Sequence, residues 1–318
     1  MSVHGPKFAS TSATAAAPAD RGQASRARGV ALVAAAGLLW STFGLGVRLM
    51  GDVGPWAILF YRAIPQIIVL VVLITVRHRG ATLRTIAGIG LNGLVSGASL
   101  TFSSMCFVYA LTLTTVAEAT LILGAAPVLA GVLGWLILRE PITRTNWWTM
   151  GLAAAGLGVM TYTGTVSGSL AGTILTFGAA LGFAAFTVFQ RRGMRTDMLS
   201  AVIVSGLLTL LVTGPLVGGV TISGMNILLA IYLGGVALAG GLALFTAGSR
   251  HVRSTELVLI AMLEVVFAPV WVWWALGEGM AVATMVGGAI ILTAVLIQAR
   301  EGQARFRRAG PMPPVSAP

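Results

Sequence analysis

Three charged residues lie well inside long apolar stretches of the sequence: Arg62, Glu118 and Glu264. A charged side chain at the centre of a membrane-spanning helix costs about 2.5–3.5 kcal/mol on insertion scales, so it indicates a functional role by default. Glu264 is at the centre of the stretch 254–276, where a carboxyl group must be protonated or paired. Its position favours proton coupling or recognition of a cationic substrate. The alternative is a neutral glutamic acid hydrogen-bonded within a helix bundle.

A second candidate site surrounds Arg62. Arginine stays charged in proteins, and Gln66, four residues further on, shares the same helix face. Pro65 lacks an N–H and therefore frees the carbonyl of Tyr61. A fixed cation beside loosened backbone favours a carboxylate or phosphate ligand. Two structural alternatives stay open: an ion pair with Glu118, which is expected at a similar depth, and snorkelling of Arg62 to the membrane surface. Glu118 is accordingly either a substrate contact or a structural partner.

Other polar residues in the apolar stretches give weaker indications. Trp40, near the middle of the first stretch, is predicted either to line a cavity and stack on an apolar ligand or to pack in the core. Ser41 and Thr42 interrupt the same stretch, and hydroxyl groups in membrane helices commonly bond to the preceding turn or join helices. Glu140 and Glu278 lie at the ends of stretches, where a structural role is expected.

The composition requires that these residues be positioned by membrane helices. Of 318 residues, 57% are hydrophobic and only 9% are charged, whereas soluble domains carry about 25% charged residues. A spanning helix needs about 20 mostly apolar residues. The sequence predicts an all-α integral membrane protein with ten spans, at 30–49, 55–76, 86–109, 115–138, 146–163, 169–190, 199–218, 226–248, 254–276 and 280–299. The flanking segments 1–28 and 301–318 are predicted to be disordered cytoplasmic tails.

The charge distribution predicts an orientation. Eighteen of the 20 Lys and Arg residues fall in the two tails and in alternate loops, while Arg48 lies at an opposite end and Arg62 inside a span. Basic residues mark the cytoplasmic side, so both termini are predicted to be cytoplasmic. The net charge of +11 is thus an orientation signal, and no nucleic-acid partner is predicted. Trp residues near the span ends are typical of interfacial belts: Trp56, Trp147, Trp148, Trp271, Trp273 and Trp274.

An internal repeat is visible at two offsets. Glu118 and Glu140 align with Glu256 and Glu278 at an offset of 138, and the first halves align more weakly at 143, where Arg48 falls on Arg191. For Glu256 an interfacial ion pair with the nearby arginines is expected. These matches predict two five-helix repeats, 29–164 and 165–300. Because five is odd, the second repeat is inverted, as in many secondary transporters that bind substrate near the midplane between their halves.

Several short motifs occur in order along the chain: GLLWSTFG in the first span, FYRAIP in the second, the connection ALTLTT, Pro127 in a fourth span rich in small residues, RE at 139–140 and LGE at 276–278. With them the sequence resembles the EamA-type ten-helix members of the drug/metabolite transporter superfamily, over roughly residues 30–300. The resemblance implies the fold and transport of small molecules. Similar proteins often have Glu-Pro in the ninth span, whereas here Val265 follows Glu264 and the proline is Pro269.

The leading hypothesis is a secondary active transporter of the cell (inner) membrane. It would export amino acids or related metabolites as its two halves rock around a midplane cavity, and Arg62 opposite acidic groups suits a substrate with both a carboxylate and an amine. Coupling to protons or sodium ions and a homodimer stay open. P-loop, HExxH and GxSxG motifs are absent, so no catalysis, cofactor or metal is predicted. The alternatives are a membrane-embedded enzyme or lipid-handling protein, and a sensor or partner-binding subunit.

Overall fold

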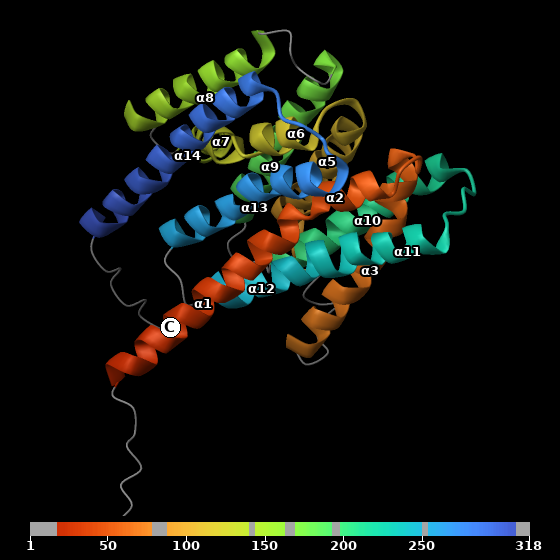
Figure 1. The fold of residues 1–318 in the computed structure, drawn as a ribbon. Helices are drawn as coiled ribbons and strands as arrows, with labels where there is room; N and C mark the ends of the chain where they lie inside the picture. Colours follow the sequence, from red (N-terminus) through yellow and green to blue (C-terminus); the bar gives the residue numbers. More distant parts are fainter. Residues whose placement is uncertain are drawn as a thin grey trace, which may run out of the picture.

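The structure is a computed structural model that describes residues 18–77, 88–139, 144–162, 169–192, 198–249 and 254–309. All regular elements in these ranges are helices, which confirms the predicted all-α class (Figure 1). They are α1 (Pro18–Ser41), α2 (Phe43–Leu49), α3 (Pro55–Arg77), α5 (Gly90–Leu113), α6 (Val116–Leu123), α7 (Ala126–Leu138), α8 (Arg144–Tyr162), α9 (Leu170–Arg192), α10 (Met198–Val217), α11 (Gly224–Ile231), the π-helix η1 (Tyr232–Gly240), α12 (Gly241–Ser249), α13 (Ser254–Leu276) and α14 (Val282–Ala309).

Seven of the described helical segments are long and apolar enough to cross a membrane, and two shorter apolar helices follow at Leu263–Leu276 and Val282–Ile297. Together with α8 they occupy the positions of the ten predicted spans. The third span is shifted along the chain from its prediction of 86–109, because α5 covers Gly90–Leu113. Gly90 has a φ of 60°, a left-handed conformation that favours glycine, and the extended residue Thr114 ends the helix.

Both terminal helices reach into segments that were expected to be disordered. α1 begins at Pro18, and α14 continues to Ala309. The added residues are rich in Ala, Arg and Gln, which have high helix propensity, and proline is favoured in the first turn of a helix. The remaining parts of the predicted tails, 1–17 and 310–318, lie outside the described residues.

Two spans are broken near their middle. α1 stops at Ser41, and α2 starts after Thr42. The fourth span stops at Leu123 and resumes as α7 at Ala126, with Pro127 in the first turn of α7, where proline is well accommodated. By contrast, Pro269 lies within the continuous helix α13. Broken helices inside a membrane protein are tolerated where protein or a cavity covers the freed backbone groups.

The helices pack in a pattern that repeats between the two halves of the chain. α1 packs on α12 and α13, and in the same way α9 packs on α5 and α7. Likewise, α3 packs on η1, and α10 packs on α5. In addition, α3 packs against α10, and α8 packs against α14. The long pair of α8 and α14 lies at one side of the bundle in Figure 1. The two sets of contacts correspond at an offset of five spans.

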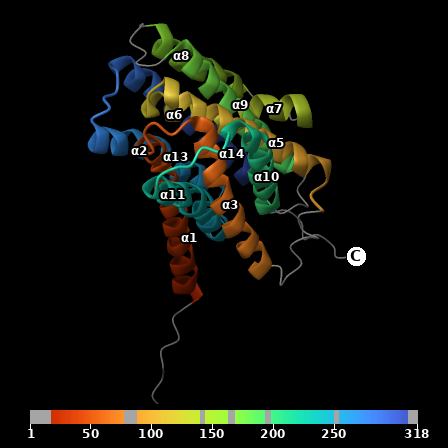
Figure 2. The same cartoon turned by 90° about the vertical axis from the view of Figure 1, so that its right-hand side faces the viewer.

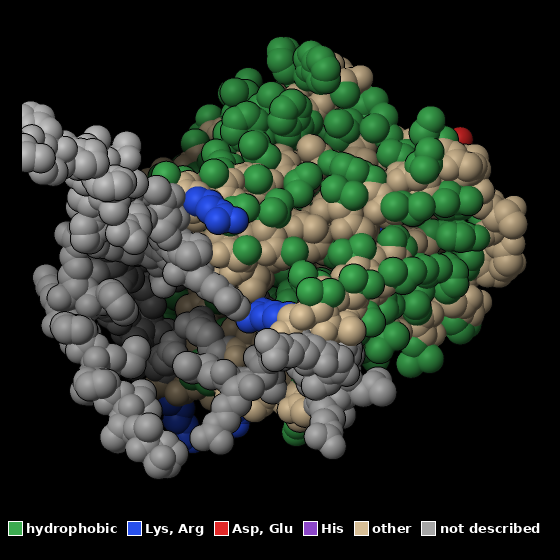
Figure 3. Space-filling view, turned by 90° about the horizontal axis from the view of Figure 1, so that it is seen from below, with side chains coloured by type: hydrophobic (Ala, Val, Ile, Leu, Met, Phe, Trp, Pro, Cys, Tyr) green, Lys and Arg blue, Asp and Glu red, His purple; other side chains and the backbone are tan. Residues whose placement is uncertain are grey.

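One end of the bundle carries several basic side chains. In Figure 2 the free ends of α1 and α3 project toward the same end of the molecule. Seen from that end, Lys and Arg side chains gather beside the undescribed residues, and hydrophobic side chains cover much of the remaining surface (Figure 3). Large apolar residues are exposed on many helices, among them Val76 at 75% and Leu211 at 71%. An outward-facing apolar surface of this extent is typical of a protein surrounded by lipid.

Candidate substrate-binding and coupling site

The break in the first span forms the first part of the site. The hydroxyl groups of Ser41 and Thr42 donate to carbonyls three residues back, each over 2.7 Å. Such back-bonding competes with the helical ladder and bends helices. The same hydroxyls also contact the second half of the chain: Trp271 Nε1 donates to Ser41 Oγ over 2.8 Å, and Tyr232 Oη lies 2.6 Å from Thr42 Oγ1. The break is therefore held by side chains from η1 and α13.

Trp40 lies directly before this break and faces the eighth span. Its ring is 5.5 Å from that of Phe245, and its indole contacts Gly241, where any larger side chain would overlap it. Trp40 is half-buried. The indole thus packs in the interior against α12 while part of it stays accessible, an arrangement that combines the two interpretations of Trp40, core packing and a cavity wall.

Arg62 forms the second part of the site. Its side chain is only 2% exposed and stands at 5.6 Å over the ring of Phe43 in a cation–π contact. Arg62 Nη1 donates to Gln66 Oε1 over 3.2 Å, which confirms that the two residues share a helix face, and Gln66 Nε2 donates to the Val202 carbonyl over 3.4 Å. Arg62 Nε is buried without an acceptor among the described residues. This guanidinium therefore lacks a counter-charge in the described part of the chain.

Close helix contact explains why Arg62 is so deeply buried. The π-helix η1 approaches α3 at Gly234, where a Cβ atom would overlap the carbonyl oxygen of Arg62 and approach Pro65 Cγ to 3.1 Å. Only glycine allows this approach. π-helical turns are rare and are frequently found at functional sites. The buried cation is thus enclosed by α2, α3, η1 and α10.

The expected ion pair between Arg62 and Glu118 is not formed. Glu118 is 1% exposed and instead accepts hydrogen bonds from Thr114 Oγ1 at 2.5 Å and from Thr173 Oγ1 at 2.7 Å. The two hydroxyls satisfy both carboxylate oxygens. The backbone N–H of Glu118 is capped by Thr115 Oγ1 over 3.2 Å. Glu118 therefore joins the start of α6 to α9 as a structural residue in this conformation.

Glu264 lies on α13 beside the break in the fourth span. Its neighbour Val265 packs against Leu121 and Ile122 of α6, and a Cβ at Gly124 would meet Val265 at 3.3 Å. Glu264 is half-buried, and within the described ranges its carboxyl group forms no hydrogen bond or ion pair. Of the other acidic residues considered from the sequence, Glu140 and the side chain of Glu256 lie outside the described residues.

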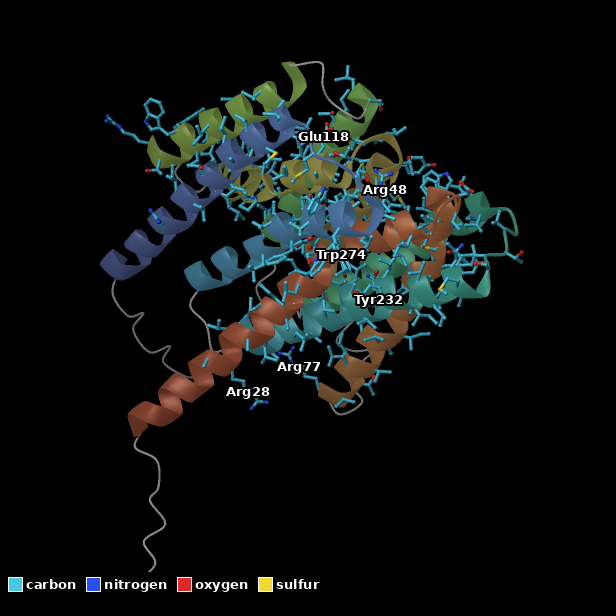
Figure 4. The ribbon with its side chains drawn as sticks, in the orientation of Figure 1. Arg28, Arg48, Arg77, Glu118, Tyr232 and Trp274 are labelled. Atoms are coloured by element: carbon cyan, nitrogen blue, oxygen red, sulfur yellow. The ribbon has the colours of Figure 1, made fainter. Side chains whose placement is uncertain are left out.

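A network at one end of the bundle was not predicted from the sequence. Arg48 Nε lies 3.1 Å from Glu278 Oε2, and Arg48 Nη2 donates to the Thr114 carbonyl over 2.8 Å. Glu278 Oε1 also accepts from the backbone N–H of Val116 over 2.7 Å. Glu278 thus accepts a hydrogen bond from the first residue of α6, in another span. This network lies beside Glu118, and Figure 4 shows Arg48 and Glu118 toward the end opposite Arg28 and Arg77.

The structure also corrects one interfacial assignment. Trp273 and Trp274 are exposed at 60% and 77%, as a belt requires. Trp271, two residues earlier, points inward to Ser41 and stacks at 5.9 Å on Phe267. The sequence signal that separates them is helical spacing, because Trp271 shares a face of α13 with Phe267 and Ala268 rather than with its aromatic neighbours.

The broken spans and the apolar exterior are those of a multi-pass membrane protein, and the buried cation Arg62 lies in its interior. Residues 27–162 match the family model described as the EamA-like transporter family. This match confirms the predicted drug/metabolite transporter assignment for this stretch of the sequence.

Two individual proteins are similar to the chain. The "Uncharacterized transporter YwfM" of Bacillus subtilis (strain 168) is 26% identical over 197 residues, which are 58% of this chain and 64% of that protein. The match therefore spans slightly less than two thirds of the relative's length. A solved structure described as "Crystal structure of protein" is 18% identical, with a TM-score of 0.62 over 90% of this chain and 99% of that one. At this identity the likeness shows the fold alone.

Proposed function

We propose that the protein is a secondary active transporter that exports amino acids or related small metabolites by alternating access. The unpaired guanidinium of Arg62 carries this proposal. Buried charges in proteins are normally paired, and an arginine fork binds a carboxylate with two parallel hydrogen bonds. A substrate carboxylate at Arg62 Nε would supply the missing counter-charge, and Gln66 would orient it.

The other candidate residues have complementary roles in this proposal. Glu264 lies beside the break between α6 and α7 without a partner in the described ranges, which suits it to a substrate amine or a transported proton. Trp40 offers an apolar wall for the rest of the substrate. Glu118, whose carboxylate is already bound by two threonines, supports the site by joining α6 to α9.

The transporter would consist of two inverted halves, 29–164 and 165–300, in the cell (inner) membrane with both termini cytoplasmic. Arg28 and Arg77 lie toward one end of the bundle in Figure 4, in accord with the charge bias of the loops. Rocking of the halves would expose the midplane to each side in turn.

The direct test is transport in proteoliposomes with a panel of radiolabelled L-amino acids, with and without imposed pH and sodium gradients. We expect saturable transport of at least one amino acid. Its amide, which lacks the carboxylate, should compete at least about tenfold more weakly, since a hydrogen bond to a charged group contributes about 1.5–3 kcal/mol. Arg62→Lys keeps the charge but loses the fork, and should weaken binding of the acid more than of the amide. Absence of transport across the whole panel would exclude the substrate class.

A further inference from the structure

The first and ninth spans are joined by two side-chain contacts that stand in the same register. The lower contact, between Ser41 and Trp271, lies at the break between α1 and α2. The upper contact, between Arg48 and Glu278, lies seven residues further along both segments. Seven residues of helix rise about 10 Å. The two segments therefore run parallel, with one contact near the middle of the span and one at its end.

The upper contact closes this end of the bundle. Arg48 ends α2, Glu278 follows α13, and both bond to the junction of α5 and α6: Arg48 to the Thr114 carbonyl and Glu278 to the Val116 N–H. Four spans, the first, third, fourth and ninth, thus meet at a single pair of opposite charges. Arg48 Nε is buried in the contact, but the two side chains remain 29% and 21% exposed. Water therefore lies close to both charges and can solvate them when the pair opens.

The short helix α2 connects the two contacts and could tilt as a unit. It has only seven residues, and it is separated from α1 by the single turn residue Thr42, whose φ and ψ of −83° and −6° stay in the right-handed helical region. Phe43 and Val47 on this short helix pack into one cluster with Val272 of α13. At the C-terminal end of α13, Gly277 has a φ of 67° and lies between the helix and Glu278. Both partners of the ion pair are therefore attached through short, bendable segments.

We propose that Arg48 and Glu278 form the gate that closes this end of the transport path, and that the contact between Ser41 and Trp271 couples the gate to the substrate. The gate rests on the alternating-access mechanism of the proposed function, in whose orientation this end is external. A substrate that enters beside Trp40 disturbs the lower contact, α2 tilts at Thr42, and the ion pair parts. The structure is then the conformation closed at the outer end.

The test measures opening without requiring a substrate. Cys106, the single cysteine, is replaced by alanine, and a reporter cysteine is placed at Val272, which is 1% exposed behind the gate. The purified protein in detergent is labelled with a membrane-impermeant maleimide. Arg48→Gln and Glu278→Gln should each accelerate labelling by about fivefold, the effect expected from loss of a partly exposed ion pair. The charge exchange R48E/E278R should slow labelling again only in part, because it restores the ion pair but not the bonds to the Thr114 carbonyl and the Val116 N–H.

Two controls make the result specific. Arg77→Gln removes a cation at the other end of the bundle and should leave the labelling rate unchanged, because it touches no part of the gate. Where Val272→Cys does not purify as a monodisperse protein, Val47→Cys on the opposite wall is the reporter. Labelling that is unaffected by both Arg48→Gln and Glu278→Gln, or that rises equally in Arg77→Gln, overturns the proposal.

A second experiment connects the gate to transport. Cysteines at positions 48 and 278, in the Cys106→Ala background, are joined by a bifunctional, reducible thiol reagent. Cross-linking should stop transport of an amino acid identified in the panel, and reduction should restore it, whereas either single-cysteine variant should be insensitive. Full transport by the cross-linked protein contradicts the gate. If the wild-type protein transports no amino acid, the proposed substrate class fails, and the labelling rates still decide whether the gate exists.

Discussion

Trp271 Nε1 donates a 2.8 Å hydrogen bond to Ser41 Oγ, and Ser41 is the last residue of α1. The acceptor hydroxyl also donates to the carbonyl of Leu38 within its own helix. The indole of the ninth span therefore fixes the hydroxyl at the point where the first span breaks. Because the two residues come from different halves of the chain, this bond links the position of the break to the packing of α13 against α1.

Removal of either partner should cost the same hydrogen bond. Trp271→Phe keeps the ring stack on Phe267 but lacks the N–H, and Ser41→Ala lacks the acceptor. Each should lower the free energy of unfolding by about 1 kcal/mol, and the double variant should lose little more than either single one. Thermal denaturation in detergent measures this coupling. Trp273→Phe, at an exposed position, is the control and should combine additively with Ser41→Ala; additivity in the Trp271 cycle would contradict the link.

The approach of η1 to Arg62 makes a second prediction about stability. Gly234→Ala should destabilise the protein by about 1–3 kcal/mol, the usual cost of overpacking, because the new Cβ would overlap the carbonyl of Arg62. Gly235→Ala, one residue further on, is the matched control: its Cβ would meet Pro65 and Val69 at an ordinary 3.6 Å. Melting temperatures of the two variants decide the matter. An equal fall in melting temperature in both variants would contradict a special role for the contact between Gly234 and α3.

Apolar length and helical spacing predicted the positions of the spans and the faces of single helices, because both depend only on nearby residues. Apolar length predicted the spans, and the spacing of four residues predicted that Arg62 and Gln66 share a face, as their hydrogen bond shows. The ion pair of Arg62 with Glu118, one of the alternatives that the sequence left open, is not formed, because depth in the membrane specifies one coordinate only. Which helix lies at that depth decides the contact, and Thr173 lies closer to Glu118.

Contacts between the two halves could not be predicted in the same way. Arg48 and Glu278 each resemble ordinary charges at the end of a span, and nothing in either local sequence indicates a partner 230 residues away. The break at Thr42 was indicated by the hydroxyls of Ser41 and Thr42, but its partners Tyr232 and Trp271 come from tertiary packing. The candidate site is thus made of residues visible in the sequence, joined by contacts that only the fold provides.

The two threonine hydroxyls on Glu118 give a third prediction. Thr173→Val removes the donor to Glu118 Oε1 and leaves a buried carboxylate oxygen unsatisfied, so the free energy of unfolding should fall by about 1–3 kcal/mol. Thr176→Val on the same helix is the control, since that buried hydroxyl bonds only to the Gly172 carbonyl of its own helix. It should cost clearly less. The measurement is thermal denaturation of both variants, and equal losses would show that Glu118 does not depend on Thr173.

Glu264 supplies the last prediction, which concerns coupling rather than stability. Glu264→Gln preserves the shape of the side chain, and its carboxyl group has no partner in the described ranges, so the melting temperature should change little. If Glu264 carries the proton, the variant should lose stimulation of transport by a pH gradient while exchange of labelled for unlabelled substrate continues. Asp52→Asn, which neutralises an exposed acid in the turn after α2, should keep the stimulation. Full pH-driven transport by Glu264→Gln would remove Glu264 from the proton path and leave it a role in substrate binding alone.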